Sequence, residues 1–460
     1  MATSTGPAGT PDSSTGTADS PPENNIVKVV FASLVGTAVE WYDFFLYGSA
    51  AALVFGPLFF PSSDPVTGTL LAFGTYALGF VARPLGGVVF GHFGDRVGRK
   101  KMLVVALMMM GLATFAIGLL PTYATIGLAA PILLLVCRLL QGFAVGGEWG
   151  GAVLMVSEHG PDSQRGFWSS WPQAGVPLGN VLATGVLFIL ASLQSDADFE
   201  AWGWRIPFLL SAVLVLIGLW VRLQLEESPV FAEAKEQIAE KGEQDSHMPI
   251  LEVVKTYPKE VFIAMGMRMA ENISYYIFTI VVITYAKDFL DVDTDLILQM
   301  LLIGAVFQFF LIPALGALSD RVGRRPLYLT GAVGVAVWSF FFLDLASSQS
   351  GPKVLLAVVV GLFFHSLMYA PQAAFFSELF GTSVRYTGAS VGYQLASIFA
   401  GALAPLIAVE LLRSGDGENT LAVALYVTAA SVITILAVLF AKETRGSSMR
   451  HDRVVRGAHD

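Results

Sequence analysis

The chain has 460 residues, of which 54% are hydrophobic, 14% are charged and 46 are glycine. Soluble proteins are about 45 to 50% apolar and about 25% charged, so this composition indicates that lipid is the main solvent. The net charge of -9 excludes the basic field of a nucleic-acid-binding protein, and a single cysteine, Cys137, excludes a disulfide framework or a Cys/His metal site. We therefore expect neither a nucleic-acid partner nor a bound metal.

Residues 1–25 are rich in Ser, Thr, Gly, Pro and Ala and lack the features of a signal peptide, which predicts a disordered tail. From residue 28 onward, twelve apolar stretches follow, each long enough for a helix to cross about 30 Å of hydrocarbon. The sequence therefore predicts an all-α integral membrane protein. The expected spans are approximately residues 28–58, 67–92, 101–120, 126–158, 166–193, 204–224, 258–288, 295–318, 326–347, 353–379, 386–411 and 419–441.

Basic residues are concentrated in the connections on one side of these spans, whereas the opposite connections are mainly acidic. The positive-inside rule places the basic side in the cytoplasm, together with both termini. The basic residues in these cytoplasmic connections are Arg96, Arg99, Lys100, Lys101, Arg165, Arg321, Arg324, Arg325 and Arg385.

One long polar segment, residues 225–259, separates the first six spans from the last six. Within it, Ser228 as N-cap and Pro229 at the first helical position predict a short helix that ends near Lys241. The expected organisation is a cytoplasmic tail (1–25), a six-helix bundle (26–225), a cytoplasmic loop (226–257), a second six-helix bundle (258–441) and a cytoplasmic tail (442–460).

Two motifs recur in the second half of the chain at nearly the same displacement. The segment GHFGDRVGRK at 91–100 returns as GALSDRVGRR at 316–325, 225 positions later. The pair SE at 157–158, followed by Arg165, returns at 377–378, followed by Arg385, 220 positions later. Such repeats indicate two duplicated bundles of parallel topology.

The repeated loop motif, G-x-x-x-D-R-x-G-R-[RK], resembles the signature loop of the major facilitator superfamily. Within that superfamily, several segments are similar to the metabolite:proton symporter family. They are GTAVEWYDF at 36–44, RLLQG at 138–142 running into GGEWGG at 146–151, WGWRIPF at 202–208, and Glu378 through RYTG at 385–388.

This resemblance implies a twelve-helix carrier of a bacterial plasma (inner) membrane that acts as a monomer by alternating access, with a proton as coupling ion and no cofactor. The family carries proline and betaine, dicarboxylates such as α-ketoglutarate and citrate, and shikimate and aromatic acids. We expect proton-coupled uptake of a small carboxylate-bearing metabolite, with betaine or proline as the alternative. The osmosensing proline/betaine branch of the family carries a long C-terminal coiled coil. The residues after Ala441 show no heptad pattern, which disfavours an osmosensory role.

An ionisable residue inside a span is costly unless it is paired or faces water, so each one is a functional candidate. Glu40, Asp43 and Tyr47 share one helical face, and Glu40 lies about 18 Å along the first span. Two neighbouring carboxylates repel each other, which favours a role in taking up and releasing a proton. The alternative is that they are static partners of a buried arginine.

Arg268 and Glu271 repeat this spacing in the seventh span, about 15 Å from its start. A guanidinium at that depth requires an anion, which is either Glu271 or a substrate carboxylate. We expect an exchange in which the substrate occupies Arg268 while Glu271 or a carboxylate of the first span takes a proton.

Arg138, near the middle of the fourth span, resembles an arginine that the superfamily implicates in proton movement; the alternative is an ion pair with a carboxylate such as Asp43. Glu148 is expected either to relay protons or to pair with the basic loop. The predicted proton-coupling residues are Glu40, Asp43, Arg138, Glu148 and Glu271. The glycines that follow Arg138 at four-residue intervals predict close helix packing: Gly142, Gly146 and Gly150.

The loop motifs are better explained as cytoplasmic gates than as ligands. Asp95 and Asp320 stand where a helix enters a basic turn, and each can bind neighbouring arginines or an opposing helix N-terminus. Glu158 with Arg165, and Glu378 with Arg385, are expected to close adjacent helix ends. The predicted gate consists of Asp95, Arg96, Arg99, Glu158, Arg165, Asp320, Arg321, Arg324, Glu378 and Arg385.

Aromatic and amide side chains complete the expected substrate cavity. A buried amide needs hydrogen-bond partners, so Gln173 and Gln394 are stronger candidates than any single aromatic residue. His365 is the one histidine well inside a span, and a packing role is favoured over a role as proton carrier. The predicted substrate-binding residues are Arg268, Tyr42, Tyr47, Gln173, Tyr275, Tyr369 and Gln394.

Other functions have weaker support. The fifth span carries glycines spaced as in the antiporter signature of the superfamily, but Asn180 stands where that signature requires proline, which disfavours efflux. The segment SVGY at 390–393 resembles a potassium filter but lies in a full-length span. No catalytic motif indicates an enzyme, and the short tails offer no signalling domain for a sensor.

Overall fold

The computed structural model describes residues 23–61, 65–97, 99–146, 153, 156–157, 160–223, 253, 255–290, 294–380 and 385–447. These residues form helices and turns, with no strand among them. Ten of the helices are long and apolar enough to cross a membrane, and two shorter apolar helices, Val104–Leu119 and Ala129–Val145, accompany them. The prediction of an all-α protein with twelve spans is confirmed.

The first half of the chain supplies six of these apolar helical segments, and several short helical turns connect them. Its elements are α1 (Glu23–Ala50), η1 (Ala51–Phe55), α2 (Gly56–Phe59), α3 (Pro65–Val97), α4 (Arg99–Leu119), α5 (Tyr123–Ile126), α6 (Ala129–Val145), η2 (Asp162–Gln164), α8 (Arg165–Leu193), α9 (Asp196–Asp198), η3 (Phe199–Gly203) and α10 (Arg205–Leu223).

The second half supplies the other six. Its elements are α13 (Pro258–Tyr276), η4 (Ile277–Val281), α14 (Val282–Thr284), η5 (Tyr285–Phe289), α15 (Thr294–Val322), α16 (Arg324–Ala346), α17 (Gly351–Leu379), α18 (Arg385–Ala396), η6 (Ser397–Ala402), α19 (Leu403–Arg413) and α20 (Thr420–Phe440).

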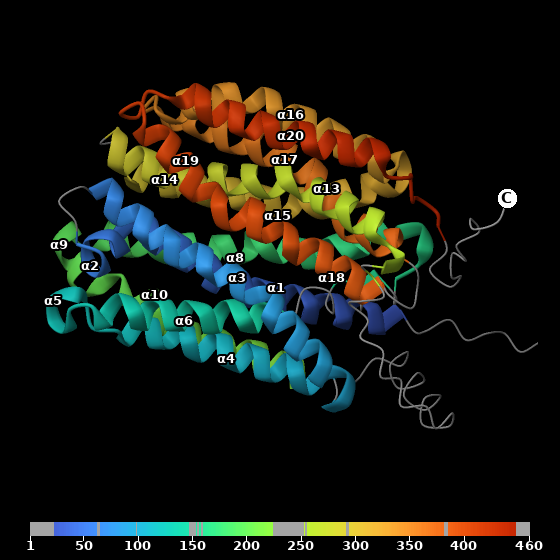
Figure 1. Ribbon diagram of the computed structural model, residues 1–460, viewed down its shortest axis with the longest axis horizontal. Coiled ribbons are helices and arrows are strands. Elements are labelled where there is room, and N and C mark those ends of the chain that lie inside the picture. Colours follow the sequence, from blue (N-terminus) through green and yellow to red (C-terminus); the bar gives the residue numbers. More distant parts are fainter. Residues whose placement is uncertain are drawn as a thin grey trace, which may run out of the picture.

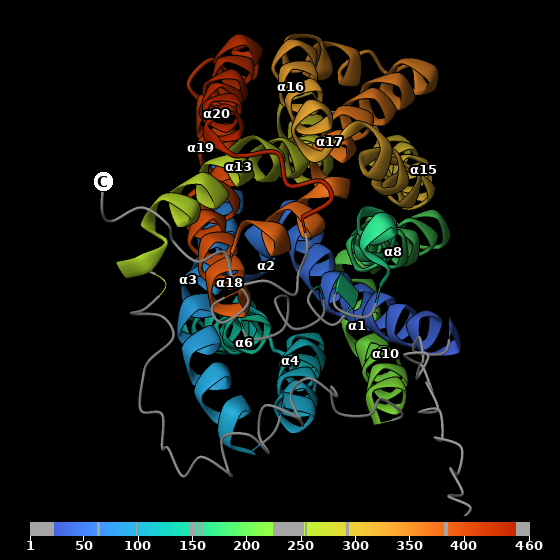
Figure 2. The ribbon, with the colours of Figure 1, turned by 90° about the vertical axis from the view of Figure 1, so that its right-hand side faces the viewer.

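The two halves form two layers of helices along a common long axis, with the N-terminal half (blue to green) below the C-terminal half (yellow to red) in Figure 1. The layers meet along two seams: α8 packs on α15, and α3 packs on α18 and η6. Seen end-on, both seams lie at the boundary between the halves (Figure 2). Functional side chains of the two halves can therefore face each other across this boundary.

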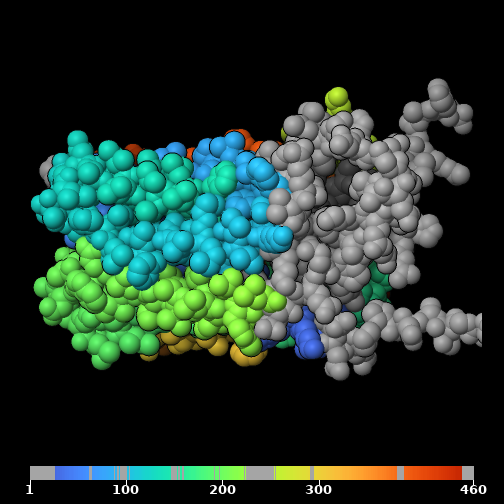
Figure 3. All heavy atoms as spheres, turned by 90° about the horizontal axis from the view of Figure 1, so that it is seen from below, coloured from blue at the N-terminus to red at the C-terminus, as the bar shows by residue number. Residues whose placement is uncertain are grey.

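The outer face of the N-terminal layer is formed by α4 and α6 (cyan to teal), with α10 (green) beside them (Figure 3). Each of these three helices exposes large apolar side chains, among them Leu112 of α4, Ile132 of α6 and Trp220 of α10. Because soluble proteins rarely expose so many large apolar residues, this surface is suited to contact with lipid chains.

Helices α3 and α6 approach each other at their glycines. A Cβ atom on Gly142 would lie 1.9 Å from the carbonyl oxygen of Gly79, and a Cβ atom on Gly146 would lie 1.9 Å from that of Arg83. Both distances are far below van der Waals contact, so only glycine fits. The packing prediction is confirmed for Gly142 and Gly146, whereas Gly150 lies outside the described residues.

Within the described residues, four of the spans contain π-helical turns, namely η1 in the first, η3 at the start of the sixth, η4 and η5 in the seventh, and η6 in the eleventh. Such turns inside α-helices frequently occur at functional sites. Since the first and seventh spans also carry the predicted carboxylates, the irregular backbone and the candidate chemistry lie on the same helices.

The predicted span limits agree with the helices to within a few residues, with two exceptions. The first helix begins at Glu23, so the predicted tail is three residues too long. Helix α6 ends at Val145, whereas the predicted span runs to residue 158; of residues 147–158 the structure describes only 153, 156 and 157, which are helical. The predicted short helix from Ser228 to Lys241 lies outside the described residues, as do residues 1–22 and 448–460.

Candidate functional site

A buried ion pair lies in the middle of α13. Nη1 of Arg268 is 3.2 Å from Oε2 of Glu271, and the two side chains are only 3% and 5% exposed. The i, i+3 spacing places them on one face of the helix, as the sequence predicts. Because the pair is shielded from water, its charges interact far more strongly than those of a surface pair.

Two residues of α17 complete the environment of Glu271. Nε2 of His365 lies 3.3 Å from Oε1 of Glu271, and Nε2 of Gln372 donates to Oε2 at 3.2 Å. The Gln372 side chain also accepts from Nη1 of Arg268 at 3.1 Å, so one amide bridges the acid and the base. We call Arg268, Glu271, His365 and Gln372 the central C-terminal cluster.

The Arg268 guanidinium has further partners on the eleventh span. Its Nη2 donates to the Ser397 hydroxyl at 3.4 Å, and its central carbon lies 3.4 Å from the centre of the Tyr393 ring. A cation over an aromatic face is stabilised by the ring quadrupole. Nε of Arg268 has no hydrogen-bond partner within the described residues, so the guanidinium retains a donor for a further acceptor.

A second buried cluster lies in the N-terminal half and contains a chain of hydrogen bonds. Arg138 donates to Oε1 of Gln141 at 3.3 Å, Gln141 donates to the Thr114 hydroxyl at 2.7 Å, and that hydroxyl donates to Oδ2 of Asp43 at 2.8 Å. We call Asp43, Thr114, Arg138 and Gln141 the central N-terminal cluster. It connects the α1 carboxylate to the α6 guanidinium through two neutral side chains.

Aromatic faces hold the guanidiniums of this half. The Arg138 guanidinium lies 4.6 Å from the ring centres of both Tyr47 and Tyr76, and that of Arg83 lies 4.3 Å from the ring of Phe80. Arg83 is buried within α3, and the sequence analysis did not single it out. Arg138 was singled out because an ionisable residue inside a span is a functional candidate, and the same reason applies to Arg83.

A cavity of about 10 Å³ lies beside Asp43, and its lining also includes Glu40, Arg83 and Arg138. A space of this size is at the lower limit for one water molecule. Oδ1 of Asp43 is buried and has no hydrogen-bond partner among the described residues. This carboxylate oxygen is therefore available to a small polar species.

A group of aromatic rings lies where α13 meets the N-terminal half. Tyr276 of α13 lies 5.8 Å from Phe44, 6.3 Å from Tyr76 and 6.1 Å from Phe80, measured between ring centres. All four side chains are buried. The Tyr76 ring also contacts the Arg138 guanidinium, so this aromatic group extends from α13 to the central N-terminal cluster.

The predicted substrate-binding residues divide into two groups. Gln173 donates to the carbonyl oxygen of Tyr369 at 3.4 Å, and Gln394 donates to that of Gly146 at 3.4 Å, so both amides cross the boundary between the halves. The rings of Tyr275 and Tyr369 lie 4.5 and 5.2 Å from that of His365. Tyr275 and Tyr369 therefore lie beside the central C-terminal cluster, Gln173 contacts the backbone of Tyr369, and Gln394 contacts the end of α6.

Tyr42 and Tyr47 lie elsewhere. The Tyr42 hydroxyl donates to the carbonyl oxygen of Pro207 at 2.6 Å, which ties α1 to α10. The Tyr47 hydroxyl is 2.6 Å from that of Thr75, and its ring supports Arg138. Their hydroxyls thus contact groups of the N-terminal half, and the structure does not bring them to Arg268.

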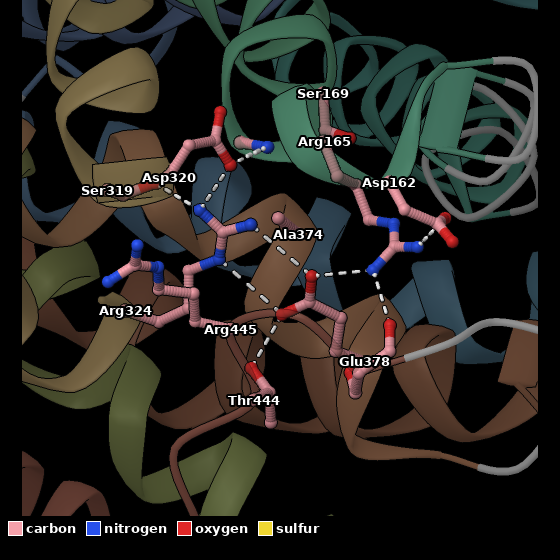
Figure 4. Close-up of polar contacts among 12 residues, drawn as sticks. Asp162, Arg165, Ser169, Ser319, Asp320, Arg324, Ala374, Glu378, Thr444 and Arg445 are labelled. Atoms are coloured by element: carbon pink, nitrogen blue, oxygen red, sulfur yellow. Dashed lines mark hydrogen bonds and ion pairs between the residues drawn. The ribbon is translucent and has the colours of Figure 1, made fainter. Parts of the chain in front are cut away.

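A third buried cluster joins the two halves at one end of the molecule (Figure 4). The carboxylate of Glu378 is 2.9 Å from Nη1 of Arg165 on α8 and 3.3 Å from Nη2 of Arg324 on α16. The Thr444 hydroxyl donates to the same carboxylate at 2.6 Å. All three charged side chains are at most 1% exposed.

Asp320 adds a second contact between the halves at this end. Its carboxylate accepts hydrogen bonds from the backbone N–H groups of Gly166 at 2.8 Å and Phe167 at 2.9 Å, at the N-terminus of α8. A helix N-terminus stabilises negative charge. Arg324 donates to the same carboxylate at 2.8 Å. We call Arg165, Asp320, Arg324 and Glu378 the basic-end cluster, and this end the basic end.

Glu378 has two partners that the sequence analysis does not predict, since it lies between Arg165 and Arg324. The predicted pairs, Glu378 with Arg385 and Arg165 with Glu158, stay predictions because the side chains of Arg385 and Glu158 lie outside the described residues. Arg321 is exposed. The remaining predictions concern side chains outside the described part of the chain, namely Asp95, Arg96, Arg99, Glu148, Glu158 and Arg385.

The halves also touch at the opposite end. The Lys287 ammonium donates to the carbonyl oxygen of Leu53, and the Thr69 hydroxyl donates to Oδ2 of Asp288 at 3.0 Å. Lys287 and Asp288 belong to η5, one of the π-helical turns of the seventh span. The central clusters thus lie between contacts at both ends of the molecule.

Comparison with known proteins identifies the family. A family model described as "Sugar (and other) transporter" matches residues 28–453, most of the chain. The chain belongs to this transporter family. The transporter is 41% identical over 419 residues to the shikimate transporter of Escherichia coli (strain K12), which covers 91% of this chain and 95% of the relative.

Two further comparisons bear on substrate and fold. The transporter is 34% identical over 444 residues to the proline/betaine transporter of Escherichia coli (strain K12), across 93% of this chain and 86% of the relative. A solved structure of the major facilitator superfamily proton:xylose symporter XylE superposes with a TM-score of 0.72 at 18% identity, covering 93% of this chain and 98% of that one. The fold is therefore that of the major facilitator superfamily, and the protein is a multi-pass membrane transporter, not an enzyme.

Proposed function

We propose that this transporter takes up a small carboxylate-bearing metabolite together with a proton, by alternating access, across a bacterial plasma (inner) membrane. The observation that carries the proposal is the buried Arg268–Glu271 pair. With Glu271 ionised, the pair is neutral and Arg268 has its counter-ion. A substrate anion therefore competes with Glu271 for the guanidinium.

The charge balance explains why substrate and proton travel together. An anion bound beside an ionised Glu271 leaves one uncompensated negative charge in a buried site, and a proton bound alone leaves Arg268 without a counter-ion; each state costs several kcal/mol. With both bound, the substrate carboxylate neutralises Arg268 while Glu271 carries the proton. The fully loaded and fully empty clusters are the two neutral states, and these are the states expected to reorient.

The substrate class follows from the chemistry of Arg268, because a planar guanidinium can hold a carboxylate through two parallel hydrogen bonds. The similarity to a shikimate transporter supports an organic acid of the hydroxylated or aromatic kind. The alternative is a zwitterion of the proline or betaine type, which the similarity to the proline/betaine transporter supports and which also offers a carboxylate. An efflux antiporter has less support, since Asn180 departs from the antiporter signature.

We further propose that the basic end faces the cytoplasm, in line with the positive-inside rule, and that the basic-end cluster is the cytoplasmic gate. The protein would act as a monomer, since one chain contributes both halves of the boundary. Asp43, Glu40 and Arg138 offer a second buried proton site, and their coupling role stays a prediction, as does that of Glu148.

Uptake in proteoliposomes tests the proposal. Purified protein would be reconstituted and given radiolabelled shikimate, an aromatic acid, a dicarboxylate or betaine, with an inward or outward proton gradient. We expect an inward gradient to accelerate uptake of one of the acids. Acceleration by the outward gradient alone would contradict symport, and transport of betaine alone would favour the alternative substrate class.

A conservative change at Arg268 tests the residue that supports the proposal. Arg268→Lys keeps the positive charge but loses the planar two-donor geometry, so we expect the half-saturation concentration for substrate to rise about tenfold. Arg413→Lys, at an exposed ion pair with Glu410, is the matched control and should leave uptake unaltered. An unchanged half-saturation concentration in Arg268→Lys would exclude Arg268 as a substrate ligand.

A further inference from the structure

The imidazole of His365 lies between an acid and an amide. Its Nε2 is 3.3 Å from Oε1 of Glu271 on α13, and its Nδ1 is 2.9 Å from Nε2 of Gln308 on α15. His365 is 1% exposed and Gln308 is fully buried. Both ring nitrogens therefore have a polar neighbour in a site without bulk water.

The observed contacts define where the imidazole proton lies. An amide nitrogen can only donate, so Nδ1 of His365 accepts from Gln308. The ring proton is then on Nε2, from which it is donated to the ionised Glu271. In this arrangement a neutral His365 and an ionised Glu271 are both hydrogen-bonded.

The other end of the Gln308 amide is unused. Oε1 of Gln308 is buried and has no hydrogen-bond partner among the described residues, whereas Nε2 also donates to the Ser366 hydroxyl at 3.2 Å. Rotation of the amide by half a turn exchanges the positions of oxygen and nitrogen with almost no change in shape. Oε1 would then accept a hydrogen bond from a protonated Nδ1.

We propose that Gln308 and His365 form a proton relay to Glu271, in which the Gln308 amide serves both tautomers of the imidazole. This inference deepens the function proposed above and rests on it. His365 carries the proton in transit, and Gln308 is a positioning residue that acts through His365.

The proton balance of the step is complete. An incoming proton binds Nδ1, the proton on Nε2 moves to Oε1 of Glu271, and the amide rotates so that Oε1 of Gln308 accepts from Nδ1. The imidazole is neutral before and after, and Glu271 has gained one proton. Glu271 now donates to Nε2 and no longer neutralises Arg268, which is then open to the substrate carboxylate.

The surroundings of the imidazole suit a relay that ends in a neutral ring. The positive charge of Arg268 on the same face of α13 disfavours a lasting imidazolium, whereas an ionised Glu271 attracts the proton. Gln308, the facing group from α15, is uncharged. The titratable or charged groups around His365 are Arg268, Glu271, Tyr275, Tyr328, Tyr369 and Tyr393.

Spectroscopy on the full-length protein in liposomes tests this relay with the proton as the only probe. The chain has six histidines, so ¹⁵N-histidine labelling with His365→Gln as a subtraction control assigns the His365 signals. We expect the Nε2–H tautomer at alkaline pH and the Nδ1–H tautomer at acid pH. The carboxylic-acid C=O infrared band of Glu271, assigned with Glu271→Gln, should appear with the same midpoint. One unchanging tautomer, or an imidazolium beside an ionised Glu271, would overturn the proposal.

A pair of variants tests Gln308 itself. Gln308→Leu removes the partner of Nδ1 in both tautomers. A buried N–H without an acceptor costs more than a buried ring nitrogen without a donor, so the midpoint of both transitions should fall by about one pH unit. Ser366→Ala removes the other partner of the same amide nitrogen without touching His365, and it should leave the midpoint in place. Equal shifts in the two variants would contradict the positioning role.

Neither measurement requires a substrate or any transport. A relay that fails in these spectra while proton-driven uptake persists would refute this inference alone. A relay that is present in a protein without proton-driven uptake would refute the proposed function alone.

Discussion

The central C-terminal cluster and the basic-end cluster use the same chemistry with different connectivity. In each, one buried glutamate contacts arginine: Glu271 contacts Arg268 of the same helix, whereas Glu378 contacts Arg165 of one half and Arg324 of the other. All members of the first cluster belong to the C-terminal half. The second cluster joins the two halves.

On the proposed function, this difference separates binding from gating. When two halves rock against each other, contacts within one half can persist, and contacts across the boundary at one end must break. The Arg268–Glu271 pair can therefore hold its ligands throughout the cycle. The Arg165–Glu378 pair is expected to be intact when the basic end is closed and broken when that end is open. A mutation in the first cluster should alter coupling, and one in the second should alter the distribution of conformations.

The largest effect is expected for Glu271→Gln. The amide keeps the size and some hydrogen bonds of the carboxylate but cannot take up a proton, so proton-driven uptake should fall about 100-fold or more, as when a positioned proton carrier is lost. Initial rates in proteoliposomes with an imposed proton gradient measure this effect.

The comparison also predicts what this variant retains. Exchange of labelled for unlabelled substrate needs no net proton movement, so it should fall much less than driven uptake in Glu271→Gln. A parallel loss of both activities would show that Glu271 is needed for binding or folding instead of coupling.

The next effect is expected for Glu378→Gln. Arg165 and Arg324 would lose their shared buried counter-ion, and such losses cost about 3 to 5 kcal/mol. Because only the state closed at the basic end contains this cluster, that end should open. The opening can be measured with spin labels at Gln164→Cys and Val322→Cys in a Cys137→Ser background. Double electron–electron resonance should show a longer distance between the two labels.

A matched control distinguishes this gating effect from a general loss of charge. Glu410→Gln removes an exposed carboxylate, 60% accessible, from its pair with Arg413 within α19. Exposed pairs contribute about 1 kcal/mol or less, so the distance between the labels should stay as in the parent. A lengthening in both variants would contradict the assignment of Glu378 to the gate.

Most of the fold could be predicted from sequence because a bilayer imposes one rule on every span. Each segment must satisfy its own backbone hydrogen bonds and be about 20 apolar residues long. The end of α6 was harder to predict. Gly142 and Gly146, which allow close contact with α3, add no polar side chain that would mark the end of a span after Arg138.

The site was predictable only in part. Spacing on one helix placed Arg268 beside Glu271, since i, i+3 geometry is local. The partners that come from distant helices could not be predicted in this way. Gln372 and Gln308 are single amides in apolar spans, and their contacts depend on how α15 and α17 pack. Arg165 as a partner of Glu378 left no local signal for the same reason, because the packing of the two halves brings it there.

A smaller effect at the same gate is expected for Gly166→Ala. A Cβ atom there would lie 2.4 Å from Nη1 of Arg324 and 2.6 Å from the carbonyl oxygen of Gly316, across the boundary. Overpacking of this kind costs about 1 to 3 kcal/mol, so the basic end should open, but less than in Glu378→Gln.

Another glycine of the same helix provides the control. At Gly185 the nearest atom to an added Cβ would be Cδ1 of Leu302 at 3.6 Å, an ordinary contact. Gly185→Ala should therefore leave the spin-label distance unchanged. If Gly166→Ala also leaves it unchanged, the close approach of α8 and α15 does not limit closure.

The smallest effect concerns Glu443, which holds Arg324 in place from within its own half. Its carboxylate accepts hydrogen bonds of 3.0 Å from the backbone N–H groups of Arg324, Arg325, Thr444 and Arg445. Partial burial alone would raise the pKa of Glu443, but these four hydrogen bonds outweigh it and lower the pKa below its usual value. A lowered pKa in the folded state means that the ionised form stabilises the protein at neutral pH, and that this contribution is lost as the pH falls through the folded-state value.

Glu443→Gln should therefore lower the free energy of unfolding at pH 7 by no more than about 1 kcal/mol, since the side chain is largely exposed and screened by solvent. Thermal unfolding in detergent would show a small decrease in Tm at pH 7 that shrinks as the pH falls through the lowered pKa of the wild-type carboxylate, where that carboxylate itself becomes protonated. Glu418→Gln, in the exposed turn before α20, is the control and should show no decrease. A decrease in Tm that persists unchanged at acid pH would mean that the shape of the side chain, and not its charge, holds the start of α16 against the basic-end cluster.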